Sequence, residues 1–332
     1  MTNVIQLGMG PLGVKMTQFI RQRQGIRTVA AVDPDPEKTG QDIGELGGDE
    51  AYGVTIQPNL DAALTAADTQ PQVALITTVS DMMRITPQIE ACAKAGLPVV
   101  STCEELFYPW DTSPDLARRI NEAAKAGNVA VIGTGVNPGF LMDTLPAQLT
   151  AVCQRVDRIE VHRVQDASKR RIPFQRKIGA GLSPDAFEAK KIDGSLRHVG
   201  LTESMQFIAG QLGWTLDKTE DIIEPVLLDR EREFPDVLVP KGYAAGVLQT
   251  GNGYIGDEVK VKLVFRAAVG EAESYDEIIV HGEPTLRSRI EGGVNGDVAT
   301  CAISINACKT VLDAPAGLHT MATLPMVSNF RW

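Results

Sequence analysis

The sequence has little of the features that mark membrane or nucleic-acid-binding proteins. No apolar run reaches the ~18 residues that a transmembrane helix needs. Only 5% of the 332 residues are aromatic, which argues against an extended stacking surface for single-stranded nucleic acid. The formal net charge of -10 repels polyanions, including anionic membrane surfaces. We therefore expect neither a nucleic acid nor a membrane as a partner.

Cysteine and histidine are scarce and scattered. The five cysteines are odd in number and contain no Cys-x-x-Cys pair, and the four histidines are isolated. This pattern argues against a disulfide framework and against a zinc or other metal site. The N-terminus shows neither the basic nor the apolar segment of a signal peptide. We expect a cytoplasmic protein with reduced thiols and no metal. The cysteines are Cys92, Cys103, Cys153, Cys301 and Cys308.

What the sequence does contain is the alternation of an α/β protein. A chain of 332 residues exceeds the size of one core, so two domains are expected. Over the first ~135 residues, apolar runs alternate with amphipathic segments, which is typical of a doubly wound parallel sheet with crossover helices. The expected strands are Val4–Gly8, Thr28–Asp33, Val73–Thr78, Pro98–Thr102 and Val129–Thr134, with a weaker candidate at Gly53–Gln57.

Capping residues predict where two helices of this half lie. Thr86-Pro87 predicts the start of a helix that ends at Gly96. Ser113-Pro114 and Gly127 bound the next helix in the same way.

The pattern changes after Gly139. Strands follow one another without helices between them, which indicates a mixed or antiparallel sheet. We predict domain boundaries at 1–136, 137–296 and 297–332, where the last segment packs back on the first domain. The expected elements are strands at Arg158–Val164, Glu258–Val269, Tyr275–Gly282 and Leu286–Glu291, and helices at Leu201–Leu212 and Asp297–Leu312, the latter capped by Asp297.

A glycine-rich turn follows the first expected strand. Residues 8–13 read Gly-Met-Gly-Pro-Leu-Gly and precede a helical segment, while Asp33 ends the second strand 20 residues after Gly13. This context predicts a Rossmann domain, in which the glycines admit a pyrophosphate and the acid binds the adenosine ribose. The alternatives are a flavodoxin-like turn and, for Asp33, a solvated turn residue. The expected cofactor-binding residues here are Gly8, Gly10, Pro11, Leu12, Gly13 and Asp33.

The cofactor is expected to be NAD or NADP. Asp33 favours NAD, because a carboxylate accepts hydrogen bonds from the free ribose hydroxyls and repels a 2′-phosphate. Lys38 would partly offset that repulsion.

Several segments together resemble one family. The chain resembles the 2,4-diaminopentanoate dehydrogenase family and the related native amine dehydrogenases, which are distant relatives of dihydrodipicolinate reductase. The segments that carry the likeness are Ser101-Thr-Cys-Glu-Glu105, Gly133-Thr-Gly-Val-Asn-Pro-Gly-Phe140, Lys177-Ile-Gly-Ala-Gly181, Arg197-His-Val-Gly-Leu201 with Glu203-Ser204, Gly292-Gly-Val-Asn-Gly-Asp297, Pro315-Ala-Gly-Leu318 and Thr320-Met321.

The resemblance implies a Rossmann domain, a mixed-sheet substrate domain, a C-terminal helix that returns to the Rossmann half, and a homodimer. It also implies oxidative deamination or reductive amination, with a catalytic glutamate in Cys103-Glu-Glu105. The chain departs from dihydrodipicolinate reductase, because the paired histidines and the lysine before a Ser-Gly-Thr turn are missing near Glu160–Gly181. A reductase of the lysine pathway is therefore not expected.

The two adjacent glutamates fit the chemistry. Glu104 and Glu105 follow the strand Pro98–Thr102 at its carboxyl end, where open α/β sheets bind ligands. A carboxylate there stabilises a cationic iminium and activates water. Glu104 is the first choice and Glu105 the alternate, while the plain alternative is two solvated loop acids. His198 is a third candidate, as a proton relay or as a structural histidine.

Other residues complete the expected site. Thr77, Thr78 and Ser80 contact the nicotinamide ribose or simply end a strand, and Asn137 and Pro138 face the carboxamide or form an interdomain turn. The expected substrate contacts are Phe140, Phe174 and Arg197. A basic cluster binds a carboxylate, the cofactor phosphates or a partner subunit, or is merely solvated. Its members are Lys169, Arg170, Arg171, Arg176 and Lys177.

These observations predict an NAD(P)-dependent amine dehydrogenase. It would interconvert a small amine or diamino acid with a ketone plus ammonia. Two alternatives are kept: an imine or carbonyl reductase of the dihydrodipicolinate reductase type, and a dinucleotide-binding sensor without turnover.

Overall fold

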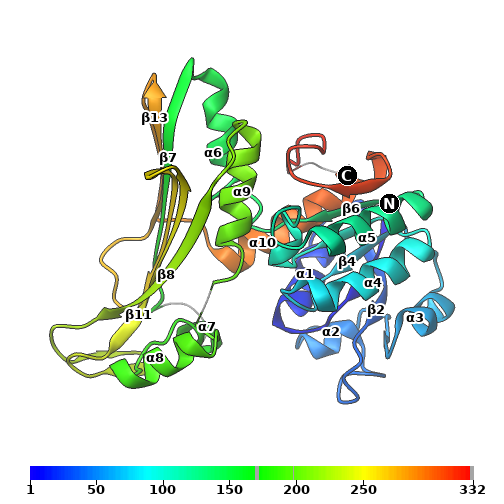
Figure 1. The fold of residues 1–332 in the computed structure, drawn as a ribbon. Coiled ribbons are helices and arrows are strands. Elements are labelled where there is room, and N and C mark those ends of the chain that lie inside the picture. Colours follow the sequence, from blue (N-terminus) through cyan, green and yellow to red (C-terminus); the bar gives the residue numbers. More distant parts are fainter. Residues whose placement is uncertain (169–171, 197, 330–332) are drawn as a thin grey trace. The chain divides into compact units, whose positions relative to one another are not determined.

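The chain divides into two units in the computed structural model, which describes residues 1–168, 172–196 and 198–329 (Figure 1). The first unit contains Met1–Phe140 and the segment from Asn295 onward, and the second contains Leu141–Val294. The chain therefore passes between the units twice, at Phe140–Leu141 and at Val294–Asn295. Each unit has its own sheet and its own core.

The first unit is built on a parallel sheet. The strand order is β15-β6-β5-β4-β1-β2-β3, and every pairing is parallel. The six strands from β3 to β6 have the order of a doubly wound dinucleotide-binding sheet, so the predicted fold class is confirmed. The strands are β1 (Thr2–Leu7), β2 (Ile26–Val32), β3 (Ile56–Gln57), β4 (Val73–Ile76), β5 (Val99–Ser101), β6 (Ala130–Gly133) and β15 (Gly317–His319).

Helices cover both faces of this sheet. On one face, alternate strand residues pack with α3, α4 and α5 in a single buried cluster. On the other, α1 packs against α10, which also contacts β4 and β5. The return of α10 to this unit confirms the C-terminal helix that was expected to pack back on the Rossmann half. The helices are α1 (Pro11–Arg21), α2 (Ile43–Leu46), α3 (Leu60–Ala66), α4 (Met82–Lys94), α5 (Pro114–Ala126) and α10 (Gly296–Thr310), with a 3₁₀ turn η3 (Val311–Asp313).

Two predicted helix starts are wrong. Helix α4 begins after Asp81, whose side chain accepts a hydrogen bond from the Arg84 amide at 2.9 Å, and Pro87 lies inside the helix. The Asp81 cap sets the start of the helix, and Pro87, which has no backbone N–H to donate, is accommodated in its second turn. Helix α10 is capped by Asn295 rather than Asp297, since the Asn295 side chain accepts from the amides of residues 297 and 298.

The second unit has a six-stranded mixed sheet in the order β14-β13-β7-β12-β11-β8. The pair β7 and β12 is parallel and the others are antiparallel. Strands β8 and β11 were not expected. In β11, Gly251 interrupts the apolar pattern where α9 (Leu201–Gln211) packs: a Cβ there would lie 3.2 Å from the Met205 side chain. The strands are β7 (Arg155–Asp166), β8 (Lys218–Leu227), β11 (Ala244–Ile255), β12 (Glu258–Ala268), β13 (Tyr275–Glu283) and β14 (Leu286–Glu291).

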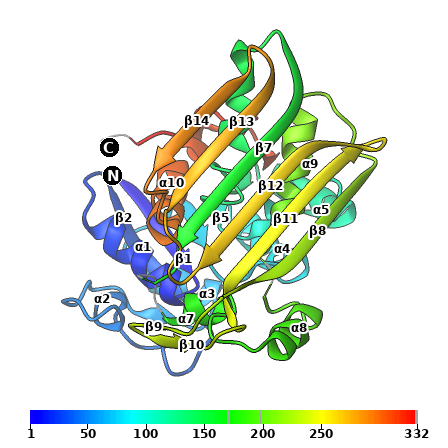
Figure 2. The same ribbon diagram turned by 90° about the vertical axis from the view of Figure 1, so that its left-hand side faces the viewer.

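Helices lie on one face of this sheet. Helix α9 (Leu201–Gln211) contacts β8, β11 and β12, and α6 (Thr144–Leu149) contacts β13. Figure 2 shows the opposite face, on which no described helix of this unit lies. That open face carries charges of both signs around Glu160, which contacts Arg158, His162 and Lys262. The remaining elements are α7 (Ile172–Lys177), α8 (Pro184–Ile192), η2 (Thr150–Val152) and the hairpin β9 (Arg232–Phe234) and β10 (Val237–Val239).

Candidate active site

The three glycines of the turn after β1 have different surroundings. Gly8 has a φ of +96°, and a Cβ there would lie 2.9 Å from the Thr78 side chain. Gly13 lies in α1 under the turn, where a Cβ would lie 1.9 Å from the Gly8 carbonyl oxygen. At Gly10, a Cβ would meet no atom within 4 Å. Gly8 and Gly13 are therefore required by packing, whereas Gly10 leaves open space at the N-terminus of α1, beside Pro11 and Leu12.

Asp33 is buried next to this turn and not solvated. Its carboxylate accepts hydrogen bonds from the amides of Met9 at 2.8 Å and Asp35 at 3.0 Å. The Lys38 ammonium lies 3.1 Å from it and 3.3 Å from the Asp35 carboxylate. Burial alone would raise the pKa of Asp33, but the two amides and Lys38 outweigh it and hold that pKa below its ordinary value. The carboxylate thus stays ionised beside the glycine turn.

A pocket of about 670 Å³ opens at the carboxyl ends of β1, β2 and β4. Gly8, Gly10, Asp33, Thr77 and Thr78 line it, so the structure brings these five predicted residues together. The sequence reasoning missed several walls of the pocket, which come from the segment after β3 and from one side of α4. Those residues are Pro58, Asn59, Leu60, Asp61, Arg84, Pro87, Gln88 and Ala91.

The end of β4 holds the glycine turn in place. The Thr77 hydroxyl donates a hydrogen bond to the Gly8 carbonyl at 2.8 Å, and the Thr78 hydroxyl donates to the Gln88 side chain at 2.8 Å. Ser80 does not line the pocket; its carbonyl accepts a hydrogen bond from the Glu105 amide at 3.3 Å. The segment after β4 therefore joins the pocket to the two candidate glutamates.

Glu104 and Glu105 form the start of a 3₁₀ turn, η1 (Glu104–Leu106), that follows β5. Both are half-buried. The Glu105 carboxylate accepts a hydrogen bond from the Met82 amide at 2.8 Å, at the first residue of α4. Glu105 is therefore engaged in a structural contact with the start of α4.

The segment after β6 contains three further predicted residues, Asn137, Pro138 and Phe140. The Asn137–Pro138 bond is cis, and Asn137 is buried. Gly139 has a φ of +136° and its Cα approaches Gly135 so closely that a Cβ would lie 2.1 Å from the Gly135 carbonyl oxygen. Phe140 is half-buried at the end of the first unit. None of the four lines the pocket described above, so their contacts with a cofactor or substrate stay predictions.

The remaining candidates lie in the second unit. Gln249 accepts a hydrogen bond from the His198 amide and donates one to its carbonyl, and the His198 ring stacks on Phe265 with centroids 4.7 Å apart. Phe174 packs against the buried core of the unit. These contacts hold His198 and Phe174 in place. Their roles in catalysis and substrate binding stay predictions. Arg197 and residues 169–171 of the basic cluster lie outside the described residues.

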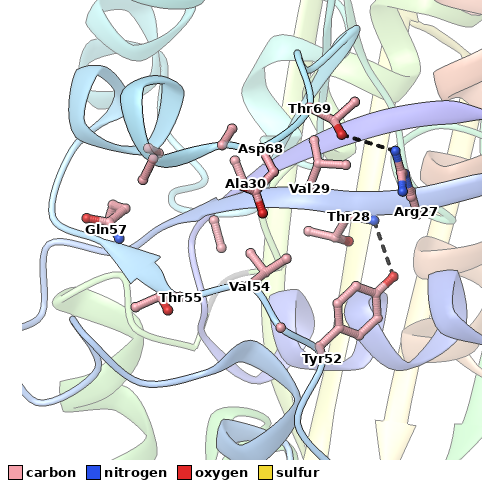
Figure 3. Close-up of a pocket in the computed structure, with 15 residues that line it drawn as sticks. Arg27, Thr28, Val29, Ala30, Tyr52, Val54, Thr55, Gln57, Asp68 and Thr69 are labelled. Atoms are coloured by element: carbon pink, nitrogen blue, oxygen red, sulfur yellow. Dashed lines mark hydrogen bonds between the residues drawn. The ribbon is translucent and has the colours of Figure 1, made fainter.

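A second pocket, of about 420 Å³, lies along β2 and shares no lining residue with the first (Figure 3). Figure 3 shows the Tyr52 hydroxyl accepting a hydrogen bond from the Thr28 amide at 3.3 Å and the Arg27 guanidinium donating one to Thr69 at 3.2 Å. Strand backbone and short side chains form most of the wall of this pocket, so it offers few groups that could take part in a reaction.

The described residues contain no group of three or more histidine, cysteine, aspartate or glutamate side chains placed to hold a metal ion. Among the same residues, no helix is long and apolar enough to cross a membrane.

Comparison with protein families identifies the chain. The family model of the 2,4-diaminopentanoate dehydrogenase C-terminal domain matches residues 140–331, which is more than half of the sequence. The chain belongs to the 2,4-diaminopentanoate dehydrogenase family. A model described as a CoA binding domain matches residues 1–103 of this family member. The resemblance seen in the sequence is thereby confirmed, and with it the expected class of enzyme, a dehydrogenase.

Named relatives agree with the family assignment. The 2,4-diaminopentanoate dehydrogenase of Acetoanaerobium sticklandii is 29% identical, over 97% of this chain and 93% of its own length. An amine dehydrogenase of Streptomyces virginiae is 23% identical over 69% of this chain and 64% of its own length. The solved amine dehydrogenase of Mycobacterium smegmatis shares the fold with a TM-score of 0.85 and 20% identity, over 99% of this chain and 98% of that one.

Proposed function

We propose that the protein is an NAD(P)-dependent amine dehydrogenase that interconverts a small amine or diamino acid with a ketone plus ammonia. The observation that carries the proposal is the position of η1. The Glu105 amide of η1 bonds to the carbonyl of Ser80, and the same segment after β4 contributes Thr77 and Thr78 to the pocket at the glycine turn. This link supports a role for Glu104 beside a dinucleotide. The named relatives support the amino substrate.

The pocket fits a dinucleotide. Gly10 leaves open space where the first turn of α1 presents its backbone amides, which suits a pyrophosphate. Asp33 and Lys38 would face the adenosine ribose, and Thr77 and Thr78 line the pocket farther along. A nicotinamide cofactor held there would supply hydride-transfer chemistry at the C–N carbon of the amine, in either direction.

Glu104 would act as the general acid and base of the reaction. Its carboxylate stabilises the cationic iminium that remains when the amine carbon has lost hydride. It then takes a proton from the water that attacks the iminium carbon and returns that proton to the nitrogen. As ammonia leaves and the ketone forms, the carboxylate takes the remaining hydroxyl proton. Asn137, Pro138 and Phe140 stay proposed contacts of the carboxamide and substrate, and Phe174, Arg197 and His198 those of the second unit.

The test is a panel of ketones offered with ammonium and each reduced cofactor, from 4-oxo acids to simple alkanones. We expect oxidation of the cofactor that requires both ammonium and a ketone and yields an amine. Oxidation without ammonium would replace the proposal with a carbonyl or imine reductase. Tight cofactor binding with no turnover for any ketone would favour a sensor.

Cofactor preference gives a second prediction. We expect the wild-type enzyme to use NAD more efficiently than NADP, because the ionised Asp33 lies in the pocket at the end of β2. Lys38→Ala removes the neighbouring cation, so the ratio of kcat/KM for NAD over NADP should rise about tenfold, the equivalent of one charged hydrogen bond to a phosphate. A wild-type preference for NADP would contradict this assignment of Asp33.

We also propose a homodimer in the cytoplasm. The open face of the second unit's sheet supports the dimer, since it carries both Glu160 and the cations Arg158 and Lys262 and is thus able to pair with a copy of itself. Four of the five cysteines are buried and all five are free, which suits a reducing compartment.

A further inference from the structure

The turn that carries Glu104 rests directly on two strands. The Ser101 hydroxyl, at the end of β5, accepts a hydrogen bond from the Cys103 amide at 3.1 Å. Gly133 of β6 lies under the turn, and a Cβ there would be 2.7 Å from the Leu106 carbonyl carbon. The side chains of Leu106 and Phe107 are fully buried. These contacts fix η1 on the side of β5 and β6.

Glu105 fixes η1 on the side of the pocket. Its backbone amide donates to the Ser80 carbonyl at 3.3 Å, and its carboxylate accepts from the Met82 amide at 2.8 Å. Ser80 continues the segment of Thr77 and Thr78, and Met82 begins α4, which contributes Arg84 and Gln88 to the pocket. One residue thus ties the turn to both the loop and the helix that line the cofactor pocket.

We infer that Glu105 is a positioning residue, which holds the neighbouring Glu104 at a fixed place relative to the pocket wall. A carboxylate suits this contact, because a charged acceptor makes a stronger hydrogen bond and is stabilised by the N-terminal end of a helix. The inference rests on the proposed function, in which Glu104 moves the protons.

The experiment compares Glu105→Ala and Glu105→Gln with the wild type, in the amine dehydrogenase assay and by dinucleotide titration. In Glu105→Ala, we expect kcat to fall by about 10- to 100-fold, since a displacement of about 1 Å at a reacting group costs up to that much. The cofactor Kd should hardly change. Glu105→Gln keeps an oxygen that accepts from the Met82 amide, and it should restore most of the lost kcat.

Asp81→Ala is the matched control. Asp81 accepts a hydrogen bond from the Arg84 amide, so its contacts lie within the same helix. The Asp81→Ala substitution removes a hydrogen-bond acceptor from the N-terminus of α4, as Glu105→Ala does. Both variants should therefore lower Tm, and only Glu105→Ala should lower kcat. Amide hydrogen exchange gives an independent readout: Glu105→Ala should lose protection in segments 80–86 and 101–107 together, and Asp81→Ala in 80–86 alone.

Each outcome separates the inference from the proposed function. A Glu105→Ala enzyme with wild-type kcat would overturn the inference. A Glu105→Gln enzyme as inactive as Glu105→Ala would overturn it too, because the charge of Glu105 would then be required in the reaction. If the wild type has no amine dehydrogenase activity, the proposed function fails, and hydrogen exchange decides the inference: paired loss in the two segments supports it, and unchanged protection of 101–107 overturns it.

Discussion

Glu104→Gln is expected to lower kcat by about 100- to 10,000-fold, the usual contribution of a general acid–base group. Glutamine keeps the shape of the side chain but neither carries the charge that stabilises an iminium nor exchanges a proton with water. The loss should appear in kcat for both directions of the reaction. Cofactor affinity should stay within about twofold of wild type, because the glycine turn and Asp33 are separate from η1.

The matched control is Glu105→Gln, which changes the adjacent residue in the same way. Its contact with Met82 survives in a weaker form, so its kcat should remain well above that of Glu104→Gln. A nearly wild-type Glu104→Gln beside an inactive Glu105→Gln would move the catalytic assignment by one residue. If both variants keep full activity, a carboxylate mechanism is wrong, and His198 becomes the next residue to replace.

The contact that holds Glu105 could not be predicted from the sequence, and the cause is specific. The contact that engages Glu105 comes from Met82, 23 residues away. The Thr86-Pro87 pair predicted that the helix starts later. Met82 would then lie in a loop, where its amide is not a helix-end donor that requires an acceptor. Asp81 and Glu105 in fact share the first amides of α4, and only the folded chain brings both carboxylates to that helix end.

The parallel half of the fold was predictable because its signals are local. Each strand is an apolar run bounded by turn residues, and all six predicted strands are present, within a few residues of the predicted bounds. The sheet of the second unit is different. Its β7 and β12 pair in parallel although about 90 residues separate them, and Gly251 of β11 lies where α9 approaches closely. Neither feature produces a local pattern in the sequence, because both depend on contacts with residues that are distant along the chain.

The glycine turn also contains a difference between single residues that the sequence pattern does not predict. In the sequence, Gly8, Gly10 and Gly13 are equivalent members of one motif. In the structure, two of them are needed by the protein itself, and only Gly10 faces open space. Gly10 also has a φ of -74°, which any residue adopts, so a side chain there leaves the backbone unstrained. This difference makes the motif testable without unfolding the protein.

Gly10→Val should therefore abolish dinucleotide binding in a folded protein. The branched side chain would occupy the space that the pyrophosphate needs, and a clash of about 3 kcal/mol corresponds to a loss of at least about 100-fold in affinity. Gly10→Ala should lose less, so that affinity falls with side-chain size while Tm stays at the wild-type value. Gly13→Ala is the contrasting variant: its Cβ would lie 1.9 Å from the Gly8 carbonyl oxygen, so Tm should fall as well. Titration of each purified variant with NAD, followed by thermal unfolding, checks both expectations. A folded Gly10→Val protein that binds NAD within about twofold of wild type would show that the dinucleotide does not lie against this turn, and the assignment of the pocket would fail with it.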